Sequence, residues 1–167
     1  MARAYLGLGS NVGDLRANLD FARRGLEAGG ITILEESQEE TTAPVGGVEQ
    51  PDFLNQALEV ETELDPMRLL ELCKLIEERA GRARDGVHWG PRVLDIDILL
   101  YEGVVVESPA LTIPHPELER RAFVLRQLLE LDADLVDPRG NVPLGELLRR
   151  LDAGPPAGPP AGLGGGS

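Results

Sequence analysis

The sequence predicts an α+β fold in a single domain, and three observations support this prediction. A length of 167 residues is typical of one domain, and a hydrophobic content of 42% is sufficient for a buried core. Strand and helix patterns follow one another in the order β-α-β-β-α-β up to Tyr101. That order is the split β-α-β plan of a ferredoxin-like sheet, to which a C-terminal hairpin strand and further helices are added.

The first half of the chain begins with a short buried strand over residues 4–8, which ends at Gly9-Ser10-Asn11. A helix follows Asp14, which can cap it, and the helix ends at Gly29-Gly30. Its apolar residues recur at helical spacing: Leu15, Leu19, Ala22 and Leu26. The second strand is predicted over about residues 31–41.

Two prolines and a glycine pair predict a loop over residues 43–52. The side chains of residues 53–62 follow the two-residue periodicity of a strand, so these residues are predicted to form the third strand. Asp65-Pro66 then opens a helix, because proline is favoured in the first helical turn. This helix is predicted to end near Ala80-Gly81.

The fourth strand of the core carries Asp95 and Asp97 and follows a polar loop over residues 82–92. The pair Glu102-Gly103 is expected to turn this strand into a hairpin strand over residues 104–106. The hairpin strand would extend the sheet beyond the four core strands.

Two helices, over residues 117–131 and 144–151, complete the predicted domain, which we place at residues 1–152. Residues 153–167 are rich in glycine and proline. They cannot bury enough apolar surface to offset the entropy of ordering, so a low-complexity disordered tail is predicted there.

Composition and charge exclude several classes of protein. A net charge of −13 argues against a protein that coats nucleic acid or an anionic membrane. Cys73 is the only cysteine, which excludes an internal disulfide and a cysteine-based zinc site. The chain shows no signal peptide and no apolar run near the ~20 residues that span a membrane. We expect a cytoplasmic protein that binds neither nucleic acid nor membrane, and a monomer.

The most informative motif is the aspartate pair on the predicted strand. Alternate residues of a strand share a face, so Asp95 and Asp97 lie together, roughly 6–7 Å apart, opposite Leu94 and Ile96. Mg²⁺ prefers oxygen ligands and takes one or two protein carboxylates, and two ions can share such a pair. A solvated polar face is the alternative, but Asp is depleted in strands. The motif therefore favours a metal site.

Candidate phosphate ligands surround this motif in the sequence. Arg82, Arg84 and Arg92 lie in the loop before the strand, where their planar guanidinium groups can hold a polyphosphate. A solvated loop with scattered charge is the alternative. His115 lies between two prolines that keep it out of a helix, and Arg121 follows it closely. A lone histidine is more often structural, but its neighbours favour a functional role.

Phe53 and Phe123 are two of three phenylalanines in the chain, and each alone would be interpreted as a core residue. Asn55 shares a strand face with Phe53. Aromatic rings beside an amide suit a flat heterocycle, because they offer stacking together with paired hydrogen bonds.

Taken together, these residues resemble the 6-hydroxymethyl-7,8-dihydropterin pyrophosphokinase family of folate biosynthesis over residues 3 to about 150. The shared blocks are Gly9-Ser10-Asn11, Thr42-Ala43-Pro44, Gln50-Pro51-Asp52-Phe53-Leu54-Asn55, Gly81-Arg82-x-Arg84, Trp89-Gly90-Pro91-Arg92-x-x-Asp95-x-Asp97, and Pro114-His115-Pro116 followed by Arg121-x-Phe123. The stretch from Trp89 to Leu99 is the signature of the family, and the other blocks follow in the family's order.

The resemblance implies transfer of the pyrophosphoryl group of ATP, the co-substrate, to the hydroxymethyl oxygen of the pterin, releasing AMP. It implies that Asp95 and Asp97 hold two Mg²⁺ ions and act in catalysis with Arg82 and Arg92. The implied ATP-binding residues are Glu77, Arg82, Arg84, Trp89, Arg92, Thr112, His115 and Arg121. The implied pterin-binding residues are Thr42, Val45, Phe53, Asn55, Trp89 and Phe123. Asp97 is the candidate to accept the hydroxyl proton.

Two other readings stay open. One is a different Mg²⁺-dependent phosphoryl or nucleotidyl transferase on a ferredoxin-like scaffold, although the sequence has no phosphate-binding Gly-x-x-x-x-Gly-Lys-Ser/Thr loop. The other is a non-enzymatic ferredoxin-like binding module, for example one that binds RNA on its sheet. Such a module needs basic and aromatic residues on the open face, which the net charge and the acidic strand disfavour.

Overall fold

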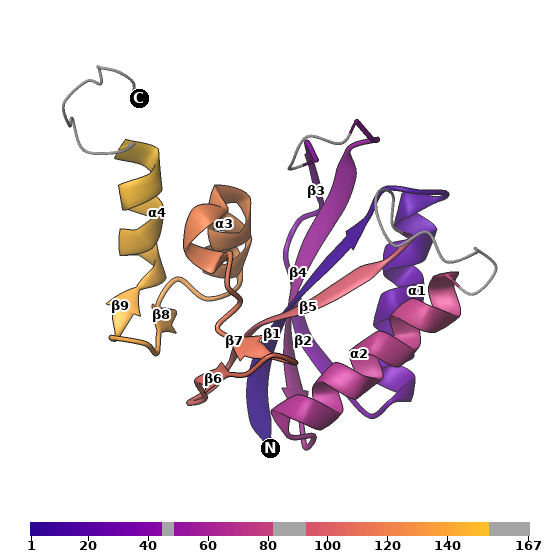
Figure 1. The fold of residues 1–167 in the computed structure, drawn as a ribbon, viewed down its shortest axis with the longest axis horizontal. Helices are drawn as coiled ribbons and strands as arrows, with labels where there is room; N and C mark the ends of the chain where they lie inside the picture. The colour runs from indigo at the N-terminus through magenta and orange to yellow at the C-terminus, as the bar shows by residue number, and fades with distance from the viewer. Residues whose placement is uncertain (45–48, 82–92, 154–167) are drawn as a thin grey trace.

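A central β-sheet separates two pairs of helices in the computed structural model, which describes residues 1–44, 49–81 and 93–153 (Figure 1). The sheet strands are β1 (Ala2–Ser10), β2 (Thr32–Glu36), β3 (Glu40–Thr42), β4 (Phe53–Thr62) and β5 (Asp95–Tyr101). The helices are α1 (Leu15–Ala28), α2 (Pro66–Gly81), α3 (Ala122–Leu131) and α4 (Leu144–Ala153). Short elements complete the chain: β6 (Val106–Glu107), β7 (Thr112–Ile113), the 3₁₀-turn η1 (Leu118–Arg120), β8 (Val136–Asp137) and β9 (Val142–Pro143).

The sheet is antiparallel throughout, with the strand order β2-β4-β1-β5 and β3 paired to β4. The two central strands, β1 and β4, therefore pair with each other along their whole lengths, from Ala2 opposite Thr62 to Ser10 opposite Leu54. The predicted mixture of helices with an antiparallel sheet is confirmed.

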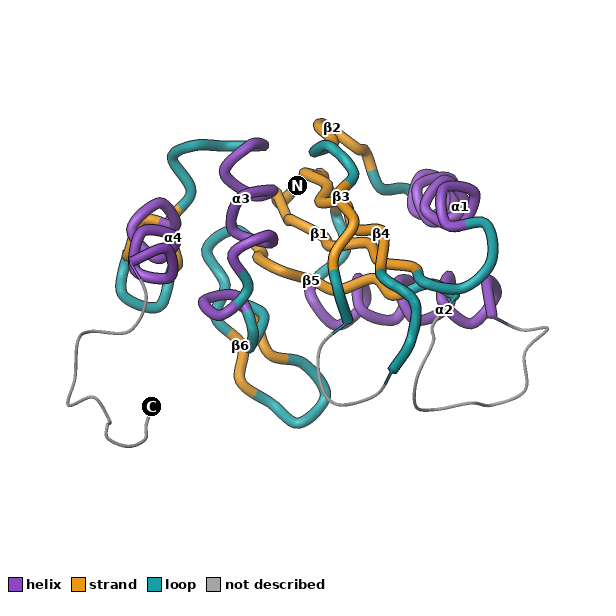
Figure 2. The backbone as a smooth tube through the Cα atoms, turned by 90° about the horizontal axis from the view of Figure 1, so that it is seen from above, coloured by secondary structure: helices purple, strands orange, loops and turns teal. Residues whose placement is uncertain are grey.

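Each face of the sheet has its own core, and strand alternation decides which side chains enter it. On β1, Ala4, Leu6 and Leu8 are buried against α1 and α2. Tyr5 points to the other face, where it joins the core formed with α3 and α4. Seen from above, the sheet is covered by α1 and α2 on one side and by α3, with α4 behind it, on the other (Figure 2).

The α1 and α2 helices begin as the sequence predicts. The carboxylate of Asp14 accepts a hydrogen bond of 3.1 Å from the Ala17 N–H, and Asp65 accepts one of 2.9 Å from the Arg68 N–H. These caps satisfy backbone donors that lack partners in the first helical turn. Leu19, Ala22 and Leu26 are the buried residues of α1, which confirms most of its predicted apolar stripe.

Three predicted elements differ from the structure. The strand expected over residues 31–41 is two strands, β2 and β3, because an extra residue interrupts the pairing with β4. The hairpin strand expected over residues 104–106 is wrong, because β6 begins at Val106 and pairs with β7 instead of β5. The helix expected over residues 117–131 is broken at Arg121, whose backbone is extended (φ −114°, ψ 98°) between η1 and α3.

The C-terminal part contains one hairpin that the sequence reading missed. Strands β8 and β9 pair antiparallel across the turn Pro138-Arg139-Gly140-Asn141. The predicted helix over residues 144–151 is confirmed as α4. Most of the predicted tail, residues 154–167, lies outside the described residues. Within the described ranges, every helix is too short or too polar to cross a membrane.

Candidate active site

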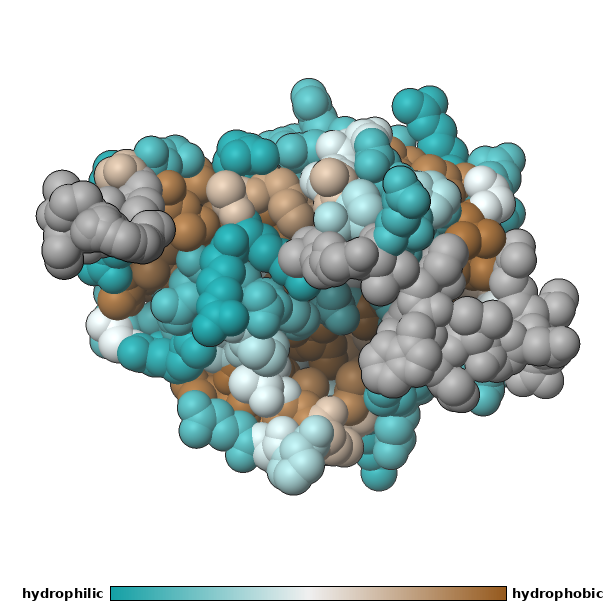
Figure 3. All heavy atoms as spheres, turned by 45° about the horizontal axis from the view of Figure 1, so that its top comes forward, coloured by the Kyte–Doolittle hydropathy of each residue, from teal (hydrophilic) through white to brown (hydrophobic). Residues whose placement is uncertain are grey.

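A cavity of about 250 Å³ opens between the sheet and α3, and it gathers residues from six parts of the chain. Eight residues singled out from the sequence line it: Thr42, Phe53, Asn55, Asp95, Asp97, His115, Arg121 and Phe123. Their blocks are separated by up to about 80 positions in the sequence, so only folding brings them together. Figure 3 shows a hollow on one face of the molecule, with apolar surface in its depth and polar surface around it.

The floor of the cavity is formed where β1 and β5 pair. Gly9 lies opposite Asp95, and Gly7 lies opposite Asp97. Directly paired residues of antiparallel strands point to the same face, so each carboxylate lies beside a residue that has no side chain. The space that a side chain would take at these two glycines is filled by Leu99 beside Gly7 and by Asn55 beside Gly9. Both aspartate side chains are partly buried where they line the cavity.

His115 approaches the aspartate pair from the loop before η1. Its Nε2 atom lies 3.8 Å from Oδ2 of Asp97, and the side chains are 21% and 48% exposed. Its Nδ1 atom accepts a hydrogen bond of 3.1 Å from the Glu117 N–H, and its own N–H donates to the Leu99 carbonyl at 3.0 Å. Acceptance at Nδ1 assigns the proton of a neutral imidazole to Nε2. The ring therefore presents a donor to the cavity.

Arg121 lines the cavity from the first position before α3, where it occupies the N-cap. The N-terminus of a helix carries partial positive charge, so a cation there is electrostatically unfavourable unless an anion is bound nearby. The extended backbone at Arg121 and the start of α3 thus combine two positive groups on one side of the cavity. An anionic ligand such as a phosphate would satisfy both.

The other side of the cavity carries an amide and two aromatic rings. Asn55 on β4 donates a hydrogen bond of 2.6 Å from Nδ2 to Oγ1 of Thr42 on β3. Phe53 shares this strand face, and Phe123 lines the cavity from α3. Both rings are only partly buried, in contrast to a core phenylalanine. The residues thus offer apolar surfaces beside polar side-chain groups.

Glu77 and Thr112 are the two described residues of the predicted nucleotide set that do not line the cavity. Oε2 of Glu77 accepts a hydrogen bond of 2.7 Å from the backbone N–H of Ile96, on the outer edge of β5. Burial, with smaller contributions from the charges of Asp95 and Asp97, raises the pKa of Glu77 to about 7, although the hydrogen bond from Ile96 acts in the opposite direction. Thr112 lies on β7 and pairs with Glu107.

Five predicted site residues, Val45, Arg82, Arg84, Trp89 and Arg92, lie outside the described residues. Among the described side chains, no group of three or more His, Cys, Asp or Glu residues converges as a metal site. The aspartate pair nevertheless fits Mg²⁺, which takes few protein carboxylates and completes its shell with water and phosphate oxygens. Carboxylate oxygens that line a cavity are the matching donor set.

Sequence reasoning missed several cavity residues. Gly7 and Gly9 line it. Their spacing of two residues matches that of Asp97 and Asp95, but the significance of this match becomes clear only when the two strands are known to pair. Gln50 and Gln127 also line it, and Gln127 is only 4% exposed. A glutamine in an apolar helical stripe is the signal that a polar partner is needed there.

An aspartate pair, a histidine and an arginine that share one cavity with aromatic rings define an enzyme acting on a small molecule. A family model described as 7,8-dihydro-6-hydroxymethylpterin-pyrophosphokinase (HPPK) matches residues 5–133. The chain is 47% identical over 153 residues to the 2-amino-4-hydroxy-6-hydroxymethyldihydropteridine pyrophosphokinase of Methylorubrum extorquens, covering 91% of this chain and 95% of that one. It is 43% identical over 129 residues to the enzyme of the same name from Bacillus subtilis, covering 77% of each chain. The chain therefore belongs to the HPPK family and is a pyrophosphokinase.

Other similar proteins are much longer than this chain. The chain is 44% identical over 149 residues to the folic acid synthesis protein fol1 of Schizosaccharomyces pombe, covering 89% of this chain and 20% of that protein. A solved structure of Plasmodium falciparum HPPK-DHPS A437G with SDX-DHP superimposes with a TM-score of 0.69 at 16% identity. That match covers 91% of this chain and 46% of the solved one, and it shows that the fold is shared.

Proposed function

We propose that this chain catalyses the Mg²⁺-dependent transfer of the pyrophosphoryl group of ATP to 6-hydroxymethyl-7,8-dihydropterin, giving the pterin diphosphate and AMP in folate biosynthesis. One observation carries the proposal. A single cavity joins an aromatic and amide side, suited to a pterin, to an aspartate pair with His115 and Arg121, suited to a polyphosphate. The two substrates would therefore meet at the boundary between these sides.

The pterin is proposed to bind between Phe53 and Phe123, with its polar edge toward Asn55 and Thr42. A pterin is flat, so the rings can stack on its faces. The hydrogen bond from Asn55 to Thr42 leaves Oδ1 of the amide as an acceptor for the donor groups of the pterin edge. Val45 and Trp89, outside the described residues, are proposed to complete this side.

The triphosphate is proposed to lie over the aspartate pair, held by Arg121 and the Nε2–H of His115. Asp95 and Asp97 would hold two Mg²⁺ ions, which supply charge neutralisation for the transferring group when bound. Arg82, Arg84, Trp89 and Arg92 remain proposed ATP ligands, with Arg82 and Arg92 assisting catalysis. Glu77 and Thr112 lie outside the cavity, so we propose a supporting role for them at the nucleotide side.

In the proposed reaction, the pterin hydroxyl oxygen attacks the β-phosphorus of ATP, and the bond from that phosphorus to the α,β-bridging oxygen breaks. AMP leaves with the bridging oxygen, and the hydroxyl proton passes to a carboxylate, for which Asp97 is the proposed acceptor. Asp97 lines the cavity, and its Oδ2 atom lies 3.8 Å from Nε2 of His115.

We further infer that β1, α1, β2, β4, α2 and β5 follow the ferredoxin-like plan in one domain over residues 1–152. The central position of β1 and β4 supports this inference. We propose that the protein acts as a monomer.

A product assay with ATP, Mg²⁺ and 6-hydroxymethyl-7,8-dihydropterin tests the proposal. AMP formed in a one-to-one ratio with pterin diphosphate would support it. Formation of ADP or inorganic pyrophosphate would favour another phosphoryl or nucleotidyl transferase with the same metal site. If ATP does not bind, the reaction is not supported.

A further inference from the structure

We infer that Gln127 is a positioning residue for the pterin side of the cavity, a role that rests on the proposed function. It acts by holding a β-bulge between β2 and β3 in the conformation that turns Thr42 toward Asn55. Gln127 lies on α3, one helical turn after Phe123, and is only 4% exposed.

The bulge follows from the strand register. Glu36 pairs with Leu58, and Glu40 pairs with Asn55, so residues 37–39 lie opposite the two residues 56–57. A one-residue offset moves every following side chain to the other face of a sheet. Because of this offset, Thr42 lies opposite Phe53 and within 2.6 Å of Asn55 Nδ2. Without it, Thr41 would occupy that place and Thr42 would point away.

A bulge leaves backbone groups without ladder partners, and buried side chains supply them here. Oγ of Ser37 accepts a hydrogen bond of 2.9 Å from the Ala57 N–H, and Gln56 Nε2 donates to the Ser37 carbonyl at 2.8 Å. The carbonyl of Gln38 then remains. It accepts from the Ser37 hydroxyl at 3.0 Å and from Nε2 of Gln127 at 3.5 Å.

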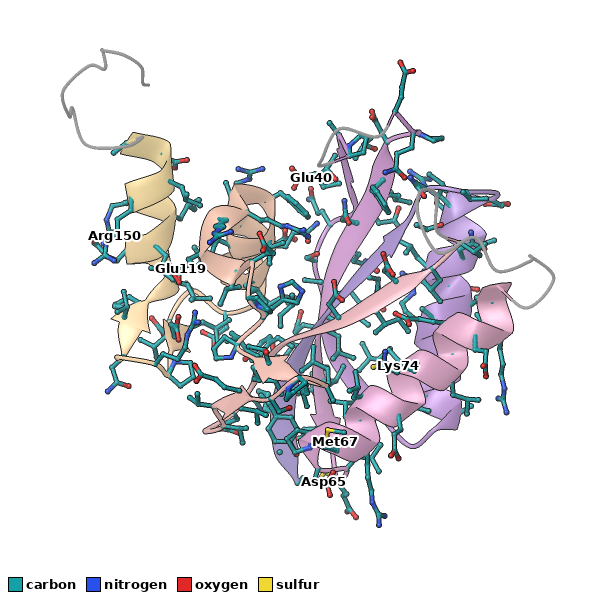
Figure 4. All side chains as sticks on the ribbon, in the orientation of Figure 1. Glu40, Asp65, Met67, Lys74, Glu119 and Arg150 are labelled. Carbon is teal, nitrogen blue, oxygen red and sulfur yellow. The ribbon has the colours of Figure 1, made fainter. Side chains whose placement is uncertain are left out.

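The same Nε2 atom of Gln127 donates to the backbone carbonyl of Asn55 at 3.2 Å. One side chain thus links α3 to the bulge and to the strand residue that carries the site amide. Two exposed contacts run beside this link: Arg126 pairs with Glu40 at 2.9 Å, and Glu130 accepts from the Gln38 N–H at 2.9 Å. Figure 4 shows Glu40 between the sheet and α3.

These neighbouring contacts differ in burial, and this difference assigns the role. The Arg126–Glu40 pair is half exposed, and such pairs contribute little. The amide of Gln127 is buried, and loss of its donor would remove the contact to the Asn55 carbonyl and leave the Gln38 carbonyl with the Ser37 hydroxyl alone. Gln127 therefore fixes the distance between α3, which carries Phe123, and β4, which carries Asn55.

The test compares Gln127→Met, which keeps the side-chain length and removes the donors, with Arg126→Ala as a matched control on the same helix. Binding of 6-hydroxymethyl-7,8-dihydropterin is measured by fluorescence titration, together with the KM for each substrate. We expect Gln127→Met to raise the Kd for the pterin about tenfold and to leave the KM for ATP within about twofold. Arg126→Ala should match the wild type for both substrates.

Unchanged pterin binding in Gln127→Met, or equal losses for both substrates, would overturn the inference. Ser37→Ala removes a second support of the bulge and is expected to show the same selective loss, so it replaces Gln127→Met if that variant does not fold. The side-chain amide NMR signal of Asn55 in the ligand-free protein provides a readout that needs no substrate. This signal should shift in Gln127→Met and stay in place in Arg126→Ala. Failure of the proposed function would be seen separately, because the wild-type protein would then form no AMP.

Discussion

Oε2 of Glu77 lies 2.7 Å from the backbone nitrogen of Ile96, the residue between the two aspartates of β5. Among the described strands, β5 is at the edge of the sheet, so its outward N–H groups have no neighbouring strand within that part of the chain. The carboxylate of Glu77 occupies this position from α2. It stabilises the part of the strand from which Asp95 and Asp97 point into the cavity.

The Glu77 carboxyl predicts a pH dependence of stability. Its pKa is raised from 4.5 to about 7, chiefly by burial. A raised pKa means that the stabilisation is present below pH 4.5 and is lost as the pH rises through about 7. Glu77→Gln keeps an acceptor for the Ile96 N–H but does not ionise. Without Mg²⁺, its stability relative to the wild type should rise between pH 4.5 and 7, by on the order of 1–2 kcal/mol after allowance for partial exposure.

Urea unfolding at pH 4.5 and pH 8, in the presence of a chelator, measures this difference. Glu71→Gln on the exposed face of the same helix is the control and should follow the wild type. Parallel curves for Glu77→Gln and the wild type would contradict the assignment.

Removal of either strand carboxylate should abolish activity without unfolding the protein. Asp95→Asn and Asp97→Asn keep the side-chain shape but remove charge that Mg²⁺ and the phosphates require, so we expect a loss of about a thousandfold or more in kcat/KM. The AMP assay and circular dichroism measure activity and fold. Asp152→Asn, an exposed carboxylate on α4, should retain full activity. An active Asp97→Asn variant would exclude Asp97 as the proton acceptor.

A side chain at Gly9 should displace the amide of Asn55. A Cβ atom there would lie 3.1 Å from Oδ1 of Asn55, so the amide would have to move and weaken its bond to Thr42. We expect Gly9→Ala to raise the KM for the pterin about tenfold, the effect of losing one well-placed hydrogen bond. Gly145→Ala on α4, where the nearest atom is a flexible arginine tip at 3.8 Å, is the comparison. Equal pterin KM values in the two variants would show that Asn55 can adjust.

His115 should affect ATP more than the pterin. In His115→Asn the shorter side chain can still accept from the Glu117 N–H, but the donor that faces Asp97 is lost. We expect the KM for ATP to rise about tenfold, as for the loss of a charge-assisted hydrogen bond, and the KM for the pterin to stay near the wild-type value. Steady-state kinetics with each substrate varied in turn measures both. If only the KM for the pterin rose, the assignment of His115 to the ATP side of the cavity would be wrong.

The sequence by itself determined the elements whose signals are local. Asp14 and Asp65 cap their helices, alternation marks β4, and the aspartate pair identifies β5, because caps and strand periodicity depend only on near neighbours. The family resemblance also followed from local motifs. The predicted site residues were identified from these motifs, and eight of them line one cavity.

Only the tertiary structure decided the features that depend on partners far apart in the sequence. The one-residue bulge at 37–39 exists because β4 pairs with two strands in different registers. The break at Arg121 has no local helix breaker, and β6 pairs with β7 against the local prediction of a hairpin with β5. The roles of Gly9 opposite Asp95 and of Gln127 against Asn55 arise from cross-strand and helix-to-sheet contacts, which sequence periodicity does not encode.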